Sequence, residues 1–445
     1  MDFQGKYVVV IGTKRSGLAA AELLSKRGAT LRALDSSVPA GEEAAKFRAL
    51  QIDVLPQAAE NLIANGRQPD LIVLSPGVPY DLPMLVQARE HGTPVIGEVE
   101  LASYFLKGPV IGITGSNGKT TITALTGHLL KACGIACQVG GNIGTAVTSM
   151  IETSHEHTWN VLELSSFQLE SIDQFRARIA VCSNVTPDHL DRHHTFECYA
   201  NAKAKLFETQ QVGDVAVLNY DDLTCREFAE RTKATVHWFS SSQRLRSGLW
   251  MLRDQIFRND EPFMTRSHIQ LLGKHNVENV MAAASVAHLA GASPSAIASA
   301  VSSFPGVEHR IEFVRELNGV KYYNDSKATN VDATLKAVDA FDGGLWIILG
   351  GKDKGGSYAP LSEPLQAKGK TALLIGAAAP LIKDTLNGAL PMVDCGTLAE
   401  AVKYAQHHAT AGDTVLLAPA CASFDQFQNY EERGRTFKNL VGELL

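Results

Sequence analysis

The sequence contains no long apolar segment, and its cysteines are few and scattered. No uninterrupted apolar run approaches the ~20 residues of a bilayer-spanning helix, so we expect no membrane insertion. The first residues, MDFQGKYVVVIG, do not join a charged leader to a long apolar core, so we expect no signal peptide. The seven cysteines include no C-x-x-C pair, which argues against a cysteine metal cluster. Reduced thiols in a cytoplasmic protein are the expected state.

The sequence also lacks an excess of positive charge. Its formal net charge is -6, which gives no reason to expect nucleic acid as a partner. A local group of lysines and arginines can still bind an anionic ligand, whatever the total charge. With 445 residues, 45% apolar and 20% charged, the chain is typical of a globular protein. At roughly 150 residues for each domain, the length predicts about three domains.

Short apolar runs alternate with helical patterns over the first hundred residues, which predicts a parallel sheet with helices on both faces. The turn from Gly12 to Gly17 lies where a Rossmann fold holds a diphosphate, and Asp35 ends the next predicted strand. The strict G-x-G-x-x-G pattern is missing because Lys14 takes the place of the second glycine. Three interpretations stay open: a dinucleotide site, a site for another nucleotide diphosphate that uses Lys14, Arg15 and Ser16, or a structural turn without a ligand.

The segment GITGSNGKTT, residues 112–121, has the pattern of a phosphate-binding loop. It follows a short apolar run and leads into a predicted helix that continues to about Lys131. Gly115 and Gly118 allow the backbone to approach a phosphate, and amide groups at the helix N-terminus point at the anion. Lys119 supplies a positive charge, and Thr120 supplies a hydroxyl for Mg²⁺. The strict pattern needs glycine at position 113, where Ile113 stands, so an ordinary glycine-rich turn is the alternative.

Several polar residues follow other predicted strands of the central region. Glu163 ends the run WNVLE, where a carboxylate can reach a metal held by the loop threonine, and Asn142 in GGNIG faces the same crevice. The spacing H-x-D-x-H-H, from His189 to His194, matches no zinc pattern. Its histidines are either surface residues or include one, His189, near a magnesium–nucleotide site. By composition, Lys203 and Lys205 are ordinary solvated lysines.

The last part of the chain again alternates strands with helices. A polar stretch, 240–265, predicts an edge hairpin, and the helix that follows holds Asn276 and Asn279 in its first turn, as cap or turn residues. The proline- and glycine-containing segment 304–310 is typical of a linker. Beyond it, three polar turns each follow a buried strand: NDSKATN, GGKDKGG and the turn that ends in Ser423. Because such turns meet at one edge of a parallel sheet, we expect a ligand there.

Together these segments resemble the Mur ligase family, the ATP-dependent amide-forming enzymes of peptidoglycan precursor synthesis. The resemblance covers nearly the whole chain and rests on GITGSNGKTT, GGNIG, ELSSFQLE, NVTPDHLDRH, KHNVENVMAA, HRIEF, NDSKATN and GGKDKG. SPGVP, GEVEL and APACASFDQFQNYEERG are most similar to the branch that adds D-glutamate. The D-N-P-R segment of the diamino-acid branch is missing, since this chain has GKDKGG there.

The resemblance implies an α/β protein of three domains: a Rossmann-like nucleotide-substrate domain (1–97), a central P-loop ATPase-like domain (98–303) and a C-terminal Rossmann-like domain that binds the amino acid (304–445). It implies two Mg²⁺ ions, an acyl-phosphate intermediate, and UDP-N-acetylmuramoyl-L-alanine and D-glutamate as substrates, and we expect a monomer. Lys119 and Thr121 would belong to the phosphate loop, and Lys203 would carry a carbamate. The implied ATP residues are Gly115, Ser116, Asn117, Gly118, Lys119, Thr120, Thr121, Asn276, Asn279, Arg310 and Asp325.

The same resemblance implies the remaining site residues. Those at the metal ions are Thr120, Glu163, His189 and Lys203, and Lys119, Glu163, His189 and Lys203 would act in catalysis. The implied substrate contacts are Ser16, Asp35, Asn142, Lys327, Thr329, Lys354 and Ser423. The first domain departs most from the family pattern, because Lys14 and Arg15 stand where other members are often apolar.

Two other functions are alternatives to a D-glutamate ligase. One is a folyl-polyglutamate synthase, which has a similar phosphate loop and also adds glutamate. The other is a non-catalytic protein that binds nucleotide and keeps the fold, although the polar turns in every domain argue against it.

Overall fold

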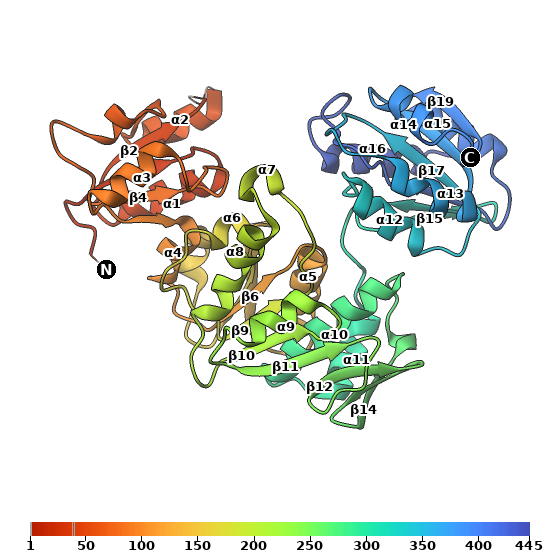
Figure 1. The fold of residues 1–445 in the computed structure, drawn as a ribbon, viewed down its shortest axis with the longest axis horizontal. Coiled ribbons are helices and arrows are strands. Elements are labelled where there is room, and N and C mark those ends of the chain that lie inside the picture. The colour runs from red at the N-terminus through yellow and green to blue at the C-terminus, as the bar shows by residue number, and fades with distance from the viewer. Residues whose placement is uncertain (1, 38, 40) are drawn as a thin grey trace. The chain divides into compact units, whose positions relative to one another are not determined.

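The computed structural model describes residues 2–37, 39 and 41–445, which form three separate β-sheets (Figure 1). These residues make two compact units. The first extends to Ile269 and also includes Glu278–Phe304; the second consists of Gln270–Val277 and Pro305–Leu445. The first two sheets belong to the first unit and the third sheet to the second. Strands and helices alternate throughout, so the predicted α/β class is confirmed.

The first sheet is wholly parallel and has the strand order β3-β2-β1-β4-β5. Side chains alternate along β1: Val8 and Val10 pack in one core cluster with Leu24, and Val9 packs in the other with Leu85. Sequence analysis missed α2 and β3, because α2 buries only Phe47 and β3 is four residues long. The elements are β1 (Tyr7–Ile11), α1 (Arg15–Lys26), β2 (Thr30–Asp35), α2 (Gly41–Ala49), β3 (Asp53–Pro56), η1 (Ala59–Leu62), β4 (Leu71–Leu74), α3 (Pro83–Glu90) and β5 (Val95–Gly97).

Two buried glutamates of α4 (Glu98–Ser103) attach the first sheet to the second. The Glu100 carboxylate accepts hydrogen bonds from three consecutive backbone amides, those of residues 173–175, at 2.8–3.0 Å. Glu98 Oε1 accepts from the amide and hydroxyl of Thr148, at 2.6 and 2.7 Å. Burial raises the pKa of Glu98. These bonds explain why the first two sheets form one unit.

The second sheet has nine strands, in the order β14-β13-β12-β11-β10-β9-β6-β8-β7. It is parallel from β7 to β12, and β12, β13 and β14 form an antiparallel edge. The predicted edge hairpin is therefore a three-stranded meander; its second turn is Asn259-Asp260, where both residues have positive φ, as in type I′ turns. The elements are β6 (Val110–Thr114), α5 (Lys119–Ala132), β7 (Cys137–Gly141), η2 (Val147–Thr153), β8 (Trp159–Glu163), α6 (Ser166–Leu169), β9 (Ile179–Cys182), α7 (Leu190–His193), α8 (Phe196–Glu208), β10 (Val215–Asn219), α9 (Leu223–Ala229), β11 (Thr235–Ser240), β12 (Gly248–Leu252), β13 (Gln255–Arg258), β14 (Glu261–Thr265), η3 (Arg266–His268), α10 (Lys274–Leu289) and α11 (Pro294–Ser302).

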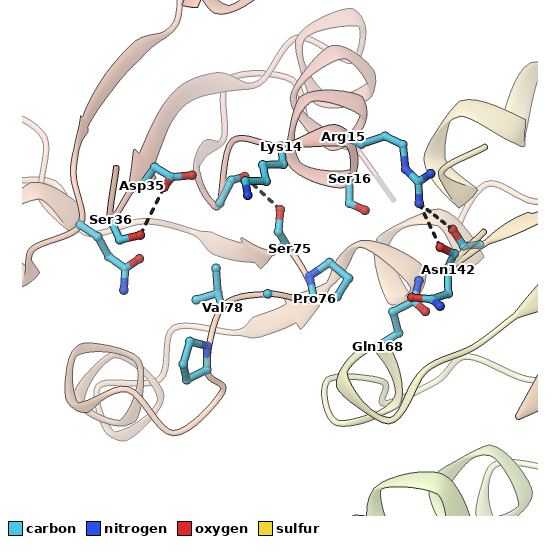
Figure 2. A pocket seen from close by; sticks show the side chains of 15 residues that line it. Lys14, Arg15, Ser16, Asp35, Ser36, Ser75, Pro76, Val78, Asn142 and Gln168 are labelled. Atoms are coloured by element: carbon cyan, nitrogen blue, oxygen red, sulfur yellow. Dashed lines mark hydrogen bonds between the residues drawn. The ribbon is translucent and has the colours of Figure 1, made fainter. Parts of the chain in front are cut away.

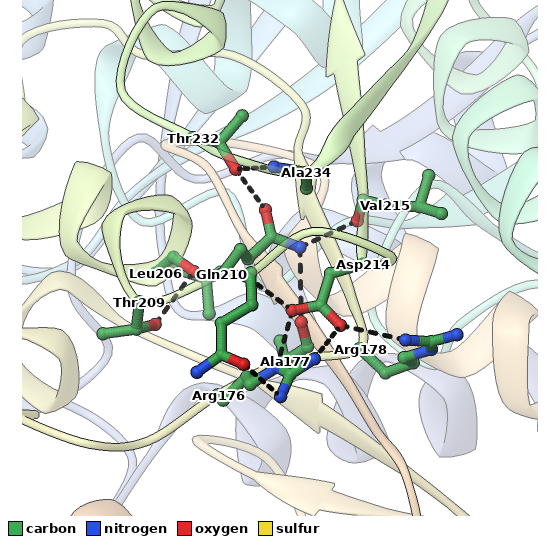
Figure 3. A network of polar contacts seen from close by, with 11 residues as sticks. Arg176, Ala177, Arg178, Leu206, Thr209, Gln210, Asp214, Val215, Thr232 and Ala234 are labelled. Carbon is green, nitrogen blue, oxygen red and sulfur yellow. Dashed lines mark hydrogen bonds and ion pairs between the residues drawn. The ribbon is translucent and has the colours of Figure 1, made fainter.

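A polar network at the amino ends of β9 and β10 holds the C-terminal end of α8 (Figure 3). The buried carboxylate of Asp214 accepts two bonds from Arg176, at 2.6 and 2.8 Å, and one from the Gln211 amide at 2.8 Å. Burial opposes these bonds, but they hold the pKa of Asp214 below its usual value. Gln210 donates to the carbonyls of Ala177 and Val215, at 3.2 and 2.9 Å. Lys203 lies on α8, so this network helps to fix the position of that lysine.

The third sheet has the order β15-β16-β20-β17-β18-β19 and is parallel except for β15. Along β17, Ile347 and Leu349 face a core cluster with α12–α14, and Trp346 and Ile348 face a second cluster with α15 and α16. The elements are β15 (Glu312–Leu317), β16 (Val320–Asn324), α12 (Val331–Asp339), β17 (Leu345–Gly350), η4 (Ala359–Leu361), α13 (Ser362–Lys368), β18 (Gly369–Ile375), α14 (Ala379–Thr385), β19 (Met392–Gly396), α15 (Leu398–His408), β20 (Thr414–Leu417) and α16 (Tyr430–Gly442).

Among the described residues, no helix is both long and apolar enough to cross a membrane. All seven cysteines are free thiols.

Candidate active site

The phosphate loop connects β6 to α5 and depends on its two inner glycines. Gly115 has a φ of 141° and Gly118 a φ of 86°, which favour glycine. A Cβ atom at Gly115 would collide with the Ser183 hydroxyl, and one at Gly118 would collide with the Asn279 side chain. The amide of Ser116 donates to the Asn184 carbonyl at 2.8 Å, so the turn after β9 supports the loop. The loop therefore requires glycine at both positions, for its backbone conformation and for its close packing against Ser183 and Asn279.

Lys203 points from α8 into this loop and is almost fully buried, with 1% of its surface exposed. Its Nζ and that of Lys119 donate to the same carbonyl, Gly115 O, at 2.8 and 2.9 Å. Burial, and secondly the charge of Lys119, lowers the pKa of Lys203 to about 7. The interpretation of Lys203 as a solvated lysine is thus wrong, whereas Lys205 is half-buried. Composition could not reveal this, because the burial comes from helix α8 lying against the loop.

Glu163 ends β8, which pairs with β6 in the same sheet. Its side chain is buried, with 1% exposed, and Oε1 accepts a hydrogen bond of 2.8 Å from Asn142 Nδ2. The other oxygen, Oε2, has no hydrogen-bond partner among the described residues. A buried carboxylate oxygen without a partner fits a metal ligand, because such an oxygen otherwise carries an uncompensated desolvation cost. Glu163 therefore ends its strand as predicted, and Asn142 lies beside it as predicted.

His189 caps α7 in a left-handed conformation with a φ of 52°. Its half-exposed ring lies 4.9 Å from the Phe167 ring, whereas His193, in the same run, is buried against Glu170 at 3.1 Å. Burial lowers the pKa of His193 to about 4. Arg192 donates to Glu170 at 2.7 Å and to the Val78 carbonyl at 3.0 Å, and so fixes α7. Within the described part of the chain, no three acidic, histidine or cysteine side chains form a ready metal-ligand set.

A pocket of about 640 Å³ opens at the carboxyl edge of the first sheet (Figure 2). Ser16 lines it, as does Asp35 at the end of β2. Asp35 Oδ2 accepts bonds of 2.7 Å from the amide and hydroxyl of Thr13. Although burial acts against it, these bonds and that from the Ser37 amide lower the pKa of Asp35. Asn142, in the loop after β7, and Gln168, in α6, line the same pocket. The predicted first-domain residues therefore share one pocket with Asn142.

The nucleotide-binding residues predicted further along the chain are mostly buried. Asn276 lies in the first turn of α10, but Asn279 lies in the second, one turn later than predicted. In the second unit, burial raises the pKa of Asp325 to about 7, although the neighbouring Arg310 partly opposes this shift. The structure places Arg310 and Asp325 close together, in the turn regions before β15 and after β16.

The three predicted polar turns of the last third meet at one edge of the third sheet. They follow β16, β20 and β17, which are neighbours in that sheet and parallel. Lys354 Nζ donates to Thr329 Oγ1 at 3.4 Å, which joins two of the turns. Lys327 Nζ lies 5.2 Å from the centre of the Tyr430 ring, and Ser423 is buried in the third turn. The three turns therefore have the geometry that sequence analysis expected of a ligand-binding edge.

Sequence analysis missed the residue that holds these turns together, Arg433 of α16. Its side chain is buried, with 1% exposed. It donates to Ser326 Oγ and O, at 3.0 and 2.8 Å, and to the Cys421 carbonyl at 3.2 Å. Burial lowers the pKa of Arg433 to about 10. No local signal marks Arg433, since only its position beneath two turns distinguishes it from the exposed Arg435.

Three Mur ligase domain families match successive parts of the chain: the MurD-like N-terminal domain (residues 6–97), the middle domain (113–287) and the glutamate ligase domain (309–421). A protein of Solibacter usitatus named UDP-N-acetylmuramoylalanine–D-glutamate ligase is 57% identical over 451 residues, which covers 100% of this chain and 99% of the relative. The chain belongs to the Mur ligase family. A protein of the same name from Koribacter versatilis is 48% identical, and the alignment covers 100% of this chain and 99% of that relative.

Two solved ligase structures have the same fold. UDP-N-acetylmuramate-alanine ligase MurC from Thermotoga maritima superimposes with a TM-score of 0.60 at 18% identity, covering 98% of this chain and 99% of that one. A pseudomurein peptide ligase type C from Methanothermus fervidus gives 0.61 at 17% identity, covering 99% and 100%. The predicted architecture of three α/β domains is therefore confirmed.

Proposed function

We propose that this Mur ligase joins D-glutamate to UDP-N-acetylmuramoyl-L-alanine at the expense of ATP, releasing ADP and phosphate. The observation that carries the proposal is the edge of the second sheet, where a phosphate loop, a buried lysine and a buried carboxylate lie together. The 57% identical relative bears the name of this ligase. We place this function in the cytoplasm, where ATP is available.

The first step is the transfer of the γ-phosphoryl group from ATP to the substrate carboxylate, which gives an acyl phosphate and ADP. A carboxylate is a poor acyl donor, so a phosphate leaving group is needed. The transfer depends on positioning and on neutralising charge. The loop residues 115–121 bind the phosphates, with Lys119 at the outer ones, and Asn276, Asn279, Arg310 and Asp325 bind the rest of the nucleotide.

Mg²⁺ fits the residues near the loop. Glu163 offers a buried oxygen that has no hydrogen-bond partner among the described residues, and Thr120 offers a hydroxyl at the helix start. Thr120, Glu163, His189 and Lys203 would hold two Mg²⁺ ions, which supply neutralising charge for the phosphates. A buried lysine with a pKa near 7 is readily neutral, which is the form that takes up CO₂ as a carbamate. We therefore include a carbamate on Lys203 in the proposal.

In the second step the amine of D-glutamate attacks the acyl carbonyl, and phosphate leaves from the tetrahedral intermediate. The two carboxylates of D-glutamate call for cations and hydroxyl donors. The turns at the edge of the third sheet supply Lys327, Thr329, Lys354 and Ser423. The pocket with Ser16, Asp35 and Asn142 binds UDP-N-acetylmuramoyl-L-alanine, and the protein acts as a monomer without nucleic acid.

An amino-acid panel tests the proposal. The protein is incubated with ATP, Mg²⁺ and UDP-N-acetylmuramoyl-L-alanine, and phosphate release is measured with D-glutamate, L-alanine or a diamino acid. We expect release with D-glutamate only. Release with another amino acid but not with D-glutamate would disprove the proposed branch. Activity on a folate instead of the muramoyl nucleotide would favour the folyl-polyglutamate synthase, and tight ATP binding without turnover would favour the non-catalytic protein.

A further inference from the structure

We propose that Arg15 is a positioning residue that fixes the glycine loop 140–144 and, through it, the carboxylate of Glu163. Arg15 is the first residue of α1, next to the first sheet, whereas the loop begins at the end of β7 and Glu163 ends β8, both in the second sheet. The proposal rests on the proposed function in one respect: it assumes that Glu163 binds a metal.

The guanidinium of Arg15 reaches three backbone carbonyls of the loop. Figure 2 shows it pointing toward Asn142. Nη1 donates to Gly144 O at 2.6 Å, and Nη2 donates to Asn142 O at 3.1 Å and to Gly141 O at 3.5 Å. A planar guanidinium with several donors suits such a set of acceptors better than a single ammonium does. Hydrogen bonds from a charged donor are also stronger than those between neutral groups.

The loop needs such an anchor because of its composition. Three of its five residues are glycines, and Gly141 and Gly144 have φ values of 104° and 62°. Glycine loses more conformational entropy on ordering than other residues do. A Cβ atom at Gly141 would collide with the Glu163 carbonyl, so the loop also lies directly against β8. Anchoring its carbonyls therefore restricts a segment that touches the end of β8.

The loop in turn sets the orientation of Glu163 through Asn142. The Asn142 amide donates to Glu163 O, and its side chain donates to Glu163 Oε1, both at 2.8 Å. These bonds occupy one carboxylate oxygen and leave Oε2 for a metal. If the loop moved, Oε1 would lose its donor and the carboxylate would be free to rotate. Because Arg15 also lines the 640 Å³ pocket, one side chain connects the nucleotide-substrate pocket with the proposed metal ligand.

Hydrogen exchange of the ligand-free protein tests the first link. We compare the wild type with Arg15→Met, Arg15→Lys and the control Lys14→Met, which removes the same charge from the same pocket. The exchange rate of the amides of residues 141 and 142 should rise about tenfold in Arg15→Met, the factor for one charge-assisted hydrogen bond. It should rise less in Arg15→Lys and stay unchanged in Lys14→Met. Equal rates in the wild type and Arg15→Met would overturn the proposal.

The Mg²⁺ concentration for half-maximal ligase activity tests the second link. It should rise about tenfold in Arg15→Met and be partly restored in Arg15→Lys. In Lys14→Met only the KM for the nucleotide substrate should change. An unchanged Mg²⁺ requirement in Arg15→Met, with faster exchange, would overturn the connection to Glu163. Since exchange is measured without ligands, failure of the proposed ligase activity would leave the first result intact and is thus distinguishable.

Discussion

The second and third sheets use the same edge in different ways. In both, polar residues follow the carboxyl ends of parallel strands. At the second sheet the charged groups themselves are buried: Lys203 and Glu163 are each 1% exposed. At the third sheet Lys354 is exposed, and the buried cation is Arg433, which supports the turns from beneath. Burial changes the chemistry of a lysine, whereas an exposed, mobile ammonium is suited to collecting an anionic ligand.

The largest expected effect is on the buried lysine of the second sheet. Lys203→Ala should lower kcat about 10²–10³-fold, the scale for losing one charged group from a site of this kind. Formate or acetate should partly restore activity, because a small carboxylate can take the place of the carbamate. Phosphate release with and without added carboxylate measures both effects.

Lys205→Ala, on the same helix, is the control for this substitution. It removes a half-buried lysine that donates to the Glu170 carbonyl, and carboxylates should not restore any activity that it loses. Wild-type activity in Lys203→Ala would contradict the carbamate and remove the chemical distinction between the two sheet edges.

The next effect concerns the buried cation of the third sheet. Arg433→Met should destabilise the turns after β16 and β20 by about 3 kcal/mol, because the carbonyls of Ser326 and Cys421 lose their donors. Hydrogen exchange of the β16 and β20 amides measures the loss. Arg435→Met, an exposed neighbour on α16, should change stability by no more than about 0.5 kcal/mol. Similar losses in both variants would show that Arg433 does not have the supporting role.

A smaller effect is expected for the exposed lysine of the third sheet. Lys354→Ala should raise the KM for D-glutamate about tenfold with little change in kcat, because one charged contact to a carboxylate is lost. Lys352→Ala is the matched control, since Lys352 is exposed in the same turn and its hydrogen bonds with Ala422 use only the backbone. A large fall in kcat with an unchanged KM would contradict a binding role for Lys354. The edges of the second and third sheets would then both supply a lysine that acts in the chemical step.

The last effect is a pH dependence of stability in the second unit. The folded Asp325 has a pKa raised from 3.8 to about 7, so the folded state holds its proton more tightly than the unfolded state. Its stabilising contribution is complete below about pH 4 and is lost as the pH rises toward 7. Compared with Asp325→Asn, the wild type should therefore become less stable as the pH rises through this range. Hydrogen exchange of β16 at both pH values measures it, and a difference that does not vary with pH would refute the prediction.

Local patterns predicted much of the fold and the candidate site. The loop at 112–121, the strand ending at Glu163 and the polar turns of the third sheet all occur where sequence analysis expected them. Each depends on contiguous residues: glycines at a strand–helix junction, or an apolar strand followed by polar residues. The elements that were missed around the first sheet, α2 and β3, are short and bury few side chains, so their patterns are weak.

By itself, the sequence determined the phosphate loop, the α/β class and the family, because these depend on residues close together in the chain. Only the tertiary structure decided the burial of Lys203, the anchoring of the glycine loop by Arg15 and the support of two turns by Arg433. The physical reason is shared: each of these side chains donates to a backbone carbonyl that lies far away along the chain. A carbonyl is present in every residue, so the sequence carries no mark of which one a lysine or arginine will reach.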